Sequence, residues 1–521
     1  MQNERYDAII VGAGHNGLVC ANYLARKGLR TLVIERRKMV GGAAVTEELW
    51  PGIKVSTASY VCSLLDRQII KELELAKYGF VFIGKEPQSF TPMLNGEHLF
   101  LYGDMKDTKK EISRFSRHDA KAYERYDRYL TGIVEAMDPI LKQSPPDIGS
   151  MASLAKFGLL NRRLVRKAQD FVDVMSLSVK DFLDRWFESD ELKASLATDG
   201  IVGAMAAPST PGTAYILLHH VMGNIEGRGR WGYVQGGMGS VSEALAKSAK
   251  SRGVKIMTDA PVDRILVEGG RAVGVVVGKR TYRAGIIVSN AEPKRTFLEM
   301  VGEDKLGENF LWKVKNYQTR SSSFKINMLL NGLPDFECYP NKTELPEPQH
   351  KGSIYMCEDF EYMERAFDDA KYGMPSRNPV ISMFIPSSVD KTLAPNGTYV
   401  AGCFVQYAPY KLKGTDWNRE NSKFIKSTIS TIRKYAPNID DILVNVQGLS
   451  PVDLESRFGL TGGNIFHGDM TPDQLFFSRF SYGTPVKGLY LCGSGTHPGG
   501  GVSGLPGFNA AKYILRNIRK I

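Results

Sequence analysis

Two stretches at opposite ends of the chain share one pattern of apolar and polar positions. Near the N-terminus, a short apolar run at residues 8–11 and a second strand pattern at 29–34 flank a segment, 18–26, whose apolar residues recur at helical spacing. Near the C-terminus, an apolar run at 488–492 precedes a helical pattern at 508–518. A run that is apolar throughout is typical of a parallel strand buried on both faces. Both stretches therefore predict a strand, a turn and a helix.

Glycines fill the first of these turns. Gly12, Gly14 and Gly17 follow the G-x-G-x-x-G spacing, and Glu35 closes the second strand about 20 residues further on. The first glycine permits a tight turn, the second lets the backbone approach a pyrophosphate, and the third allows close helix packing. The free N–H groups of the helix N-terminus favour phosphate. Because an acid at the strand end binds ribose hydroxyls and disfavours a 2′-phosphate, the turn predicts a dinucleotide site that does not take NADP.

A second glycine turn lies in the middle of the chain. Residues 235–239 are rich in glycine and precede a helical pattern at 241–252. Ser240 and Glu243 have the three-residue separation of a capping box, in which each side chain satisfies a backbone N–H of the helix N-terminus. We therefore expect this helix to begin directly after Ser240.

Three more segments bear on the architecture. A hairpin is predicted to turn at Gly269-Gly270, and the apolar run at 286–289 predicts another buried strand. The stretch 200–225 is long and uncharged, but two prolines break it. It is either the wall of a lipophilic cavity or a buried core segment, because both use the same residue types.

Composition narrows the class of protein. The chain has 521 residues, enough for two or three domains, and its net charge of +11 is spread along the sequence. No zinc-finger, RNP or basic-zipper pattern is present, so nucleic acid is not an expected partner. No apolar run is long and regular enough to span a bilayer, and the chain enters its first strand too early for a cleaved signal.

The cysteines exclude several kinds of site. The six cysteines are widely scattered, and none forms a C-x-x-C pair. This spacing argues against a zinc site, against a disulfide framework and against the cysteine pair of a disulfide reductase. We therefore expect no metal site and a reducing compartment.

The segment after Glu35 carries a family resemblance. The words GAGHNGL and GGAAVTEE, the second with the Gly41-Gly42 pair, resemble the phytoene desaturase-like branch of the glutathione-reductase-type flavoproteins, which also include the amine oxidases. The resemblance implies an α/β fold with a discontinuous Rossmann-like FAD-binding domain and an α+β substrate domain. The implied FAD-binding domain comprises residues 1–78, 230–300 and 475–521, and the substrate domain comprises 79–229 and 301–474.

The same resemblance implies noncovalent FAD and a set of binding residues. The Gly-Gly stretch passes along the cofactor toward the flavin, the backbone of Val262 meets the adenine, and the glycine loop near the C-terminus approaches the phosphates and then the isoalloxazine ring. The expected cofactor-binding residues are Gly12, Ala13, Gly14, Asn16, Gly17, Glu35, Arg36, Gly42, Ala43, Val262, Asn290, Gly493, Ser494, Gly501 and Val502. No catalytic residue is assigned, because His219, His220 and His467 have no carboxylate partner in the sequence and are interpreted as structural.

Three functions remain open. The resemblance favours an FAD-dependent oxidoreductase that transfers hydride from a lipophilic carotenoid- or isoprenoid-like substrate. A flavin amine oxidase is less favoured, because residues 499–503 hold no aromatic side chain where amine oxidases carry them. The third alternative is a flavin-binding interaction protein with little turnover.

The sequence also gives expectations about partners and cellular location. Residues 154–171 combine an apolar side with basic residues, and they are interpreted either as a peripheral contact with an anionic membrane or as an ordinary amphipathic surface helix. The expected location is the cytoplasm, or the mitochondrial matrix in a eukaryote, and the oligomeric state stays open.

Overall fold

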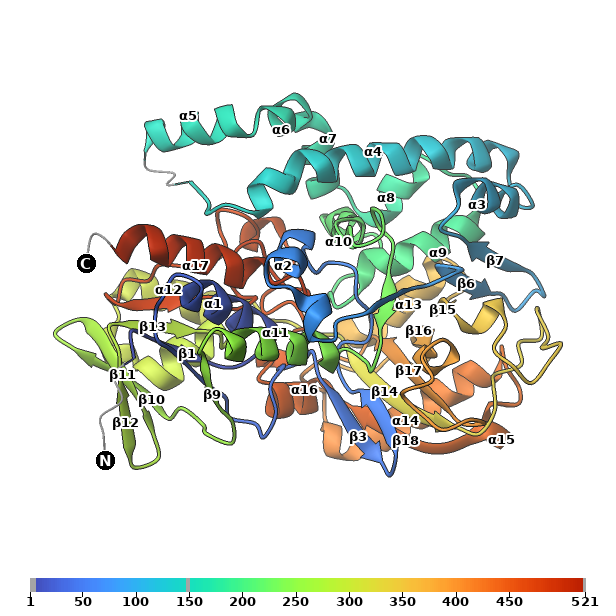
Figure 1. The fold of residues 1–521 in the computed structure, drawn as a ribbon. Helices are drawn as coiled ribbons and strands as arrows, with labels where there is room; N and C mark the ends of the chain where they lie inside the picture. Colours follow the sequence, from blue (N-terminus) through green and yellow to red (C-terminus); the bar gives the residue numbers. More distant parts are fainter. Residues whose placement is uncertain (1–5, 147–149, 519–521) are drawn as a thin grey trace.

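The computed structural model describes residues 6–146 and 150–518, and a parallel five-stranded sheet forms one half of it (Figure 1). The strand order is β19-β13-β1-β2-β9. All four neighbouring pairs are parallel. The bounds are β1 Ala8–Val11, β2 Thr31–Ile34, β9 Lys255–Met257, β13 Ile286–Ser289 and β19 Leu489–Leu491. Segments from the two ends and the middle of the chain therefore build one sheet, which confirms the mixed α/β class with a Rossmann-like unit.

Three helices cover one face of this sheet. α1 His15–Ala25 contacts both α11 Gly239–Ser251 and α17 Leu505–Asn517. Ala8 and Ile10 of β1 pack toward these helices, whereas Ile9 and Val11 pack on the opposite face. A strand buried on both faces explains why the run at 8–11 is apolar throughout.

The opposite face carries a small antiparallel sheet. It consists of β10 Arg264–Glu268, β11 Arg271–Val277 and β12 Arg280–Arg283. Gly269 and Gly270 connect the first two strands with φ of +55° and +74°, a region that favours glycine. The predicted hairpin is confirmed.

The capping-box prediction is wrong. α11 begins at Gly239, so Ser240 already lies in its first turn, and the N-cap residue Met238 forms no side-chain cap hydrogen bond. Gly239 leaves room for Thr46, whose Oγ1 accepts a hydrogen bond from the Gly239 N–H over 2.9 Å. A side chain from a distant strand therefore caps the helix in place of its own serine.

A seven-stranded sheet forms the other half of the molecule. Its order is β18-β14-β17-β16-β15-β6-β7, and only the β15–β6 pair is parallel. The bounds are β6 Ser89–Pro92, β7 His98–Leu101, β14 Phe324–Leu330, β15 Ser353–Met356, β16 Val380–Phe384, β17 Tyr399–Gln406 and β18 Leu443–Leu449. All of these strands come from the segments assigned to the substrate domain. The exact domain boundaries stay a prediction.

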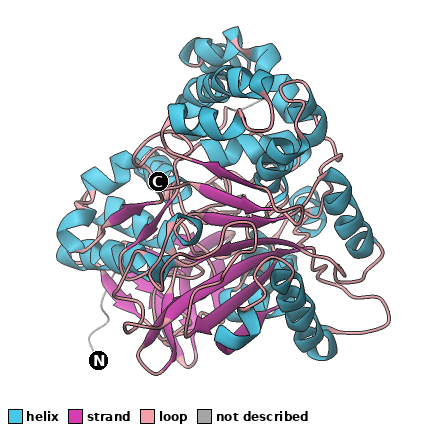
Figure 2. Cartoon of the chain, turned by 90° about the vertical axis from the view of Figure 1, so that its right-hand side faces the viewer, coloured by secondary structure: helices cyan, strands magenta, loops and turns pink. Residues whose placement is uncertain are grey.

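Helices enclose this sheet. α14 Trp417–Arg433 packs on one face through Phe424, Ile429 and Ile432. A helical layer lies above the strands (Figure 2), built from α4 Arg117–Leu141, α8 Val179–Asp184, α9 Asp190–Ile201 and α10 Thr213–Val221. The other elements are β3 Thr46–Trp50, β4 Ile53–Ser56, α2 Arg67–Glu72, β5 Phe82–Gly84, α3 Met105–Ile112, β8 Gly232–Val234, α12 Glu308–Asn316, α13 Phe360–Lys371, α15 Ile439–Ile442 and α16 Pro451–Phe458.

We expected the segment 154–171 to form one helix, and this prediction is wrong. It is divided among α5 Met151–Leu160, α6 Arg162–Arg166 and α7 Ala168–Ser176, with breaks at Asn161 and Lys167. The Asn161 amide donates to the Phe157 carbonyl over 2.7 Å and so competes with the helical ladder. α5 and α6 lie along the top of Figure 1, away from both sheets. None of the helices in the described part of the chain has the length and apolar character that crossing a bilayer requires.

Candidate functional site

A continuous cavity connects the two halves of the molecule. It has a volume of about 320 Å³, within the range of small-molecule sites. At one end it meets the turn after β1, where Gly12, Gly14 and Glu35 line it. At the other end it reaches the seven-stranded sheet at Lys325 and Tyr355. The arrangement suits a long ligand with one end on each sheet.

The turn after β1 forms a cradle. Gly12 has φ of +97°, and a Cβ on Gly14 would lie 2.7 Å from the Asn290 side-chain nitrogen. α1 begins at His15 with no side-chain cap hydrogen bond and no acid in its first turn. Its N–H groups and positive dipole end therefore stay available to an anion.

Glu35 holds the cradle together. Its carboxylate accepts hydrogen bonds from the Ala13 N–H over 2.8 Å and from the Arg37 N–H over 2.9 Å. The side chain is buried but lines the cavity. Because an ionised carboxylate offers about four acceptor positions, Glu35 retains capacity for ribose hydroxyls.

The glycine loop near the C-terminus lies against the first turn. The Asn16 side-chain amide donates to Ser494 Oγ over 3.0 Å. A Cβ on Gly493 would lie 2.6 Å from the Asn290 carbonyl oxygen, and a Cβ on Gly501 would lie 2.6 Å from Leu64. The loop is glycine-rich because its backbone packs closely against other backbone and side-chain atoms.

The structure brings most of the expected cofactor residues to this cavity. Those that line it are Gly12, Gly14, Asn16, Glu35, Arg36, Gly42, Ala43, Val262, Asn290, Ser494, Gly501 and Val502. Ala13, Gly17 and Gly493 lie behind the lining and shape it. A Cβ on Gly17 would collide with the Gly12 carbonyl oxygen, which is the close helix packing that the motif predicts.

Unpartnered polar atoms show that the cradle fits a polar ligand. His15 Nε2, Asn16 Oδ1 and Ser59 Oγ are buried without a hydrogen-bond partner among the described residues, and all three residues line the cavity. Buried polar atoms are rarely left unpaired. Together with the free end of α1 and the Glu35 carboxylate, they fit the phosphates, ribose and flavin edge of FAD.

The far end of the cavity was not predicted from the sequence. Lys325, Phe404, Ser382 and Tyr355 stand directly opposite one another on β14, β17, β16 and β15. We call these four residues the transverse row. All four line the cavity, so the seven-stranded sheet supplies its floor. No sequence motif marks them, because their register depends on strands far apart in the chain.

Two buried lysines reach this end. Lys85 Nζ donates to Ser353 Oγ over 2.7 Å, and Lys325 Nζ donates to Asn327 Oδ1 over 2.5 Å. Burial lowers the pKa of Lys85 to about 8 and that of Lys325 to about 7. Both ammonium groups therefore stand in a region where charge is costly.

Two of the histidines that line the cavity are neutral near pH 7. Burial lowers the pKa of His219 and His467 to about 3 each. His219 Nε2 lies 3.2 Å from the Gly500 carbonyl oxygen, but the Nδ1 atoms of both residues lack a partner in the part of the chain that the structure describes. The interpretation of His219 and His467 as purely structural residues is therefore incomplete, because their Nδ1 atoms remain available to a ligand.

The fold brings two cysteines together that are remote in sequence. Cys20 on α1 and Cys492 after β19 are fully buried free thiols that interact. Burial and the neighbouring thiol raise the pKa of Cys492 well above its usual range. A reductase requires a lowered thiol pKa and access to substrate, so this pair does not fit that role.

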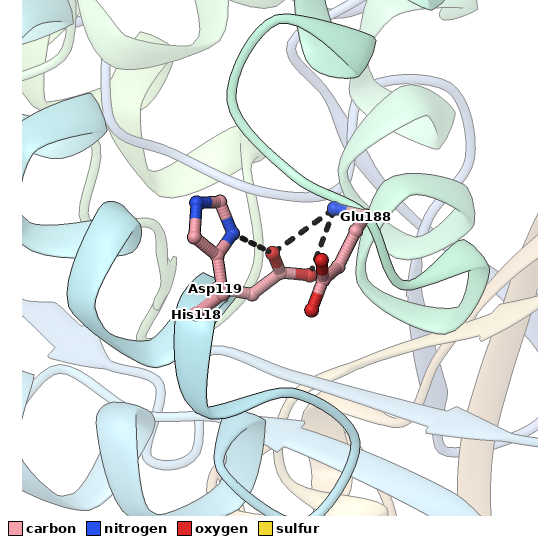
Figure 3. A group of neighbouring side chains, drawn as sticks. All are labelled: His118, Asp119 and Glu188. Carbon is pink, nitrogen blue, oxygen red and sulfur yellow. Dashed lines mark hydrogen bonds and ion pairs between the residues drawn. The ribbon is translucent and has the colours of Figure 1, made fainter.

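A cluster of one histidine and two acids has the composition of a metal site. His118, Asp119 and Glu188 lie within reach of one another (Figure 3). The fully buried Asp119 carboxylate already accepts hydrogen bonds from the backbone N–H groups of Glu188 and Ser189 and from Ser189 Oγ. Its acceptor capacity is used to join α4 to the start of α9, so the cluster is a structural connection.

The stretch 200–225 serves both of its alternative roles. Most of α10 is buried core, including Tyr215 and Leu218. Val202, His219 and His220 line the cavity. The aromatic lining comes from other segments, with Tyr60 stacked on Phe384 at a centroid distance of 3.9 Å.

Comparisons with known proteins agree with this architecture. Residues 10–68 match the model of an NAD(P)-binding Rossmann-like domain. The chain is 44% identical to pyridine nucleotide-disulfide oxidoreductase domain-containing protein 2 of Rattus norvegicus, over 99% of this chain and 94% of the rat protein.

More distant relatives also match over nearly their full length. A limonene dehydrogenase subunit from Castellaniella defragrans is 27% identical, over 99% of this chain and 95% of its own. Phytoene desaturase (lycopene-forming) of Pseudescherichia vulneris is 21% identical, over 95% and 96%. A solved putrescine oxidase structure shares the fold, with a TM-score of 0.60, 14% identity and coverage of 99% of both chains.

Proposed function

This chain belongs to the family of pyridine nucleotide-disulfide oxidoreductase domain-containing protein 2, and we propose that it removes hydride from a lipophilic, isoprenoid-like substrate with FAD as the acceptor. The expected resemblance to the phytoene desaturase-like flavoproteins is confirmed. The chain is accordingly an oxidoreductase of the FAD-dependent desaturase and amine oxidase superfamily. The substrate class and the cofactor are the proposed parts.

The continuous cavity carries the proposal. It is lined by the dinucleotide cradle around Gly12 and Glu35, by Gly501 and Val502, and by residues of the seven-stranded sheet. A ligand anchored in the cradle therefore shares one enclosed space with a second ligand on the sheet. Transfer of hydride between two ligands needs this proximity.

The residues of the cavity bind, orient and exclude water. FAD bound in the cradle would supply the hydride acceptor. Asn16 and Ser494 hold the loops from the two ends of the chain together at the cradle. Aromatic side chains such as Tyr60 and Phe404 give the opposite wall an apolar surface. His219 and His467 are not assigned as bases, since lining histidines with a pKa of about 3 accept a proton only weakly.

The relatives support an isoprenoid-like substrate. Two of them are named for limonene and for phytoene, which are isoprenoid hydrocarbons. The likeness to putrescine oxidase concerns the fold alone. A protonated Lys85 disfavours a cationic amine beside it at the far end of the cavity, because like charges in a buried region repel strongly.

Anaerobic reduction tests the proposed function. The purified protein is expected to be yellow, and addition of a limonene- or phytoene-type substrate without oxygen should bleach the flavin absorbance. Bleaching by alkylamines alone would support amine oxidation. A protein that binds FAD but is reduced by neither class would support the interaction role, and a protein that stays colourless after FAD addition would contradict the cofactor assignment.

Acid precipitation tests whether FAD is noncovalent. Cys492, the cysteine nearest the glycine loop, is fully buried beside Cys20. We therefore expect flavin to appear in the supernatant after precipitation. Flavin retained in the pellet would contradict this expectation.

We also propose that α5 and α6 contact an anionic membrane from which a lipophilic substrate enters. Leu159, Leu160 and Val165 are 73%, 58% and 61% exposed. Arg162 and Arg163 lie between them in sequence, and this mixture suits an anionic bilayer surface. Co-sedimentation with phosphatidylglycerol vesicles should exceed that with phosphatidylcholine vesicles, and the double variant Leu159→Ser/Val165→Ser should lose it.

We propose the cellular location from the state of the cysteines. Free buried thiols are consistent with a reducing compartment, either the cytoplasm or the mitochondrial matrix. Cell fractionation that places the protein in an oxidising compartment would contradict this location.

A further inference from the structure

Charged and polar side chains line the far end of the cavity. Lys325 and Tyr355 stand at the two ends of the transverse row, and Ser382 and Phe404 lie between them. Ser353, two residues before Tyr355 on β15, faces the same side of the sheet and lines the cavity with them. This polar floor is more than a hydrocarbon needs, because its ammonium groups keep donor hydrogens that an apolar ligand cannot accept.

Lys85 is a buried lysine in this region that has no ion-pair partner among the described residues. It is 4% exposed, lies just before β6, and donates to Ser353 Oγ over 2.7 Å. None of the ion pairs found in residues 6–146 and 150–518 involves it. An ammonium has three donor hydrogens, and a neutral serine accepts only one of them. A buried cation of this kind is costly unless an anion compensates it.

Asp199 does not provide that compensation fully. Its carboxylate, from α9, accepts the Tyr355 hydroxyl over 2.9 Å. It raises the pKa of Lys85 from a distance, against the larger effect of burial. Since the Asp199 carboxylate is already bonded to Tyr355, the far end of the cavity, which we call the chamber, holds no described anion that pairs directly with the Lys85 ammonium.

We propose that this chamber is a subsite for the carboxylate end of a lipophilic substrate, with the Lys85 ammonium as its ion-pair partner. The carboxylate would take the free donor hydrogens of Lys85, and the apolar chain would extend along Tyr60 and Phe404 toward the cradle. Lys85 is thus a specificity-determining residue. The proposal rests on the proposed function, and it changes the substrate from a plain isoprenoid hydrocarbon to an isoprenoid acid.

Binding of three matched probes tests this subsite. Farnesoic acid, farnesol and farnesylamine share one chain and differ in the head group. Isothermal titration calorimetry on the FAD-loaded protein at pH 7 should show that the acid binds at least tenfold more tightly than the alcohol. Equal binding of acid and alcohol, or no binding of the acid, would overturn the proposal. If farnesylamine bound most tightly, the head group would pair with the Asp199 carboxylate, and this result would also overturn the proposal.

Three variants test whether the charge of Lys85, and not a change in folding, determines the preference for the acid. Lys85→Met should bind farnesol as the wild type does and lose the preference for the acid, whereas Lys85→Arg should keep at least part of it. Lys247→Met, at an exposed position on α11, is the matched control and should change nothing. FAD content and thermal midpoint of each variant report folding. Retained acid preference in a folded Lys85→Met protein would contradict the proposal.

Flavin reduction distinguishes the two proposals. If the acid preference depends on Lys85 but no probe bleaches the flavin anaerobically, the subsite stands and the proposed reaction fails. If an isoprenoid hydrocarbon bleaches the flavin while head groups make no difference to binding, the reaction stands and the subsite fails.

Discussion

The Asn16 side-chain amide donates a hydrogen bond to Ser494 Oγ over 3.0 Å, although the two residues are 478 positions apart. Asn16 belongs to the first turn of α1, and Ser494 belongs to the glycine loop after β19. Both residues line the cavity, and the side-chain oxygen of Asn16 has no partner among the described residues. This contact fixes the relative position of the two loops that would enclose FAD.

Removal of this hydrogen bond should weaken FAD binding. Ser494→Ala leaves the buried Asn16 amide without its acceptor, which costs on the order of 1 kcal/mol, or about fivefold in affinity. Titration of the apo-protein with FAD, followed by flavin fluorescence, measures the change. Ser113→Ala, at an exposed serine that ends α3, is the control. Unchanged affinity in Ser494→Ala would show that this contact does not position the cofactor.

Two substitutions in the cradle should weaken FAD binding further. Glu35→Ala removes both the bonds that hold the Ala13 and Arg37 backbone and the acceptor for ribose, so we expect a loss of about 1–3 kcal/mol. Gly14→Val should do more damage, because even a Cβ would lie 2.7 Å from the Asn290 side chain. Calorimetric titration with FAD measures both. Wild-type affinity in both variants would place the dinucleotide elsewhere.

Val502→Asp should separate FAD binding from flavin chemistry. Val502 lines the cavity beside Gly501 and takes no part in the Glu35 hydrogen bonds that hold the cradle, so binding should change little. A carboxylate near the ring disfavours the negative charge of the reduced flavin. About 1–2 kcal/mol of repulsion corresponds to a reduction potential lower by roughly 20–45 mV.

Potentiometric titration at equal FAD occupancy measures this shift. Val502→Asn is the neutral control of equal size and should keep a potential close to that of the wild type. A normal or higher potential in Val502→Asp would mean that the glycine loop does not face the flavin ring.

Acidification should destabilise the protein before its surface carboxylates titrate. Burial lowers the pKa of His15 and His497 to about 4 and that of His219 and His467 to about 3. An unfolded histidine has a pKa of about 6.5, so the unfolded chain gains these protons first and stability falls as pH drops below 6.5. Glu292, whose pKa burial raises to about 7, takes up a proton in the folded state and offsets part of this loss.

The net effect is measurable as a change in unfolding free energy. Between pH 7.5 and pH 5.5 we expect a loss of about 3 kcal/mol, with the four histidines outweighing Glu292. Urea unfolding at the two pH values measures it, and His497→Gln should make the loss smaller by about 1 kcal/mol. Equal stability at both pH values would show that these histidines are protonated in the native protein.

Elements that depend on local chemistry were predictable from the amino-acid sequence. The strands at Ala8–Val11 and Ile286–Ser289 match the predicted runs in full, because a strand buried on both faces is almost entirely apolar. Ser289, the one polar residue among them, is buried with its hydroxyl bonded to that of Thr296. The glycine spacing identified the cradle, since each glycine answers a steric demand within a few residues. The start of α1 was three residues earlier than the apolar periodicity indicated, because its first turn faces the cavity and contains His15 and Asn16 in place of apolar residues.

The residues at the far end of the cavity came together only through the pairing of distant strands. The transverse row combines Lys325, Phe404, Ser382 and Tyr355 through the register of four strands, and no local pattern encodes a register between distant segments. Lys85, directly after β5, follows the same rule, because composition predicts an exposed lysine and the fold buries it beside Ser353 of β15. Local periodicity therefore specified the dinucleotide cradle, while strand pairing across the chain specified the chamber at its other end.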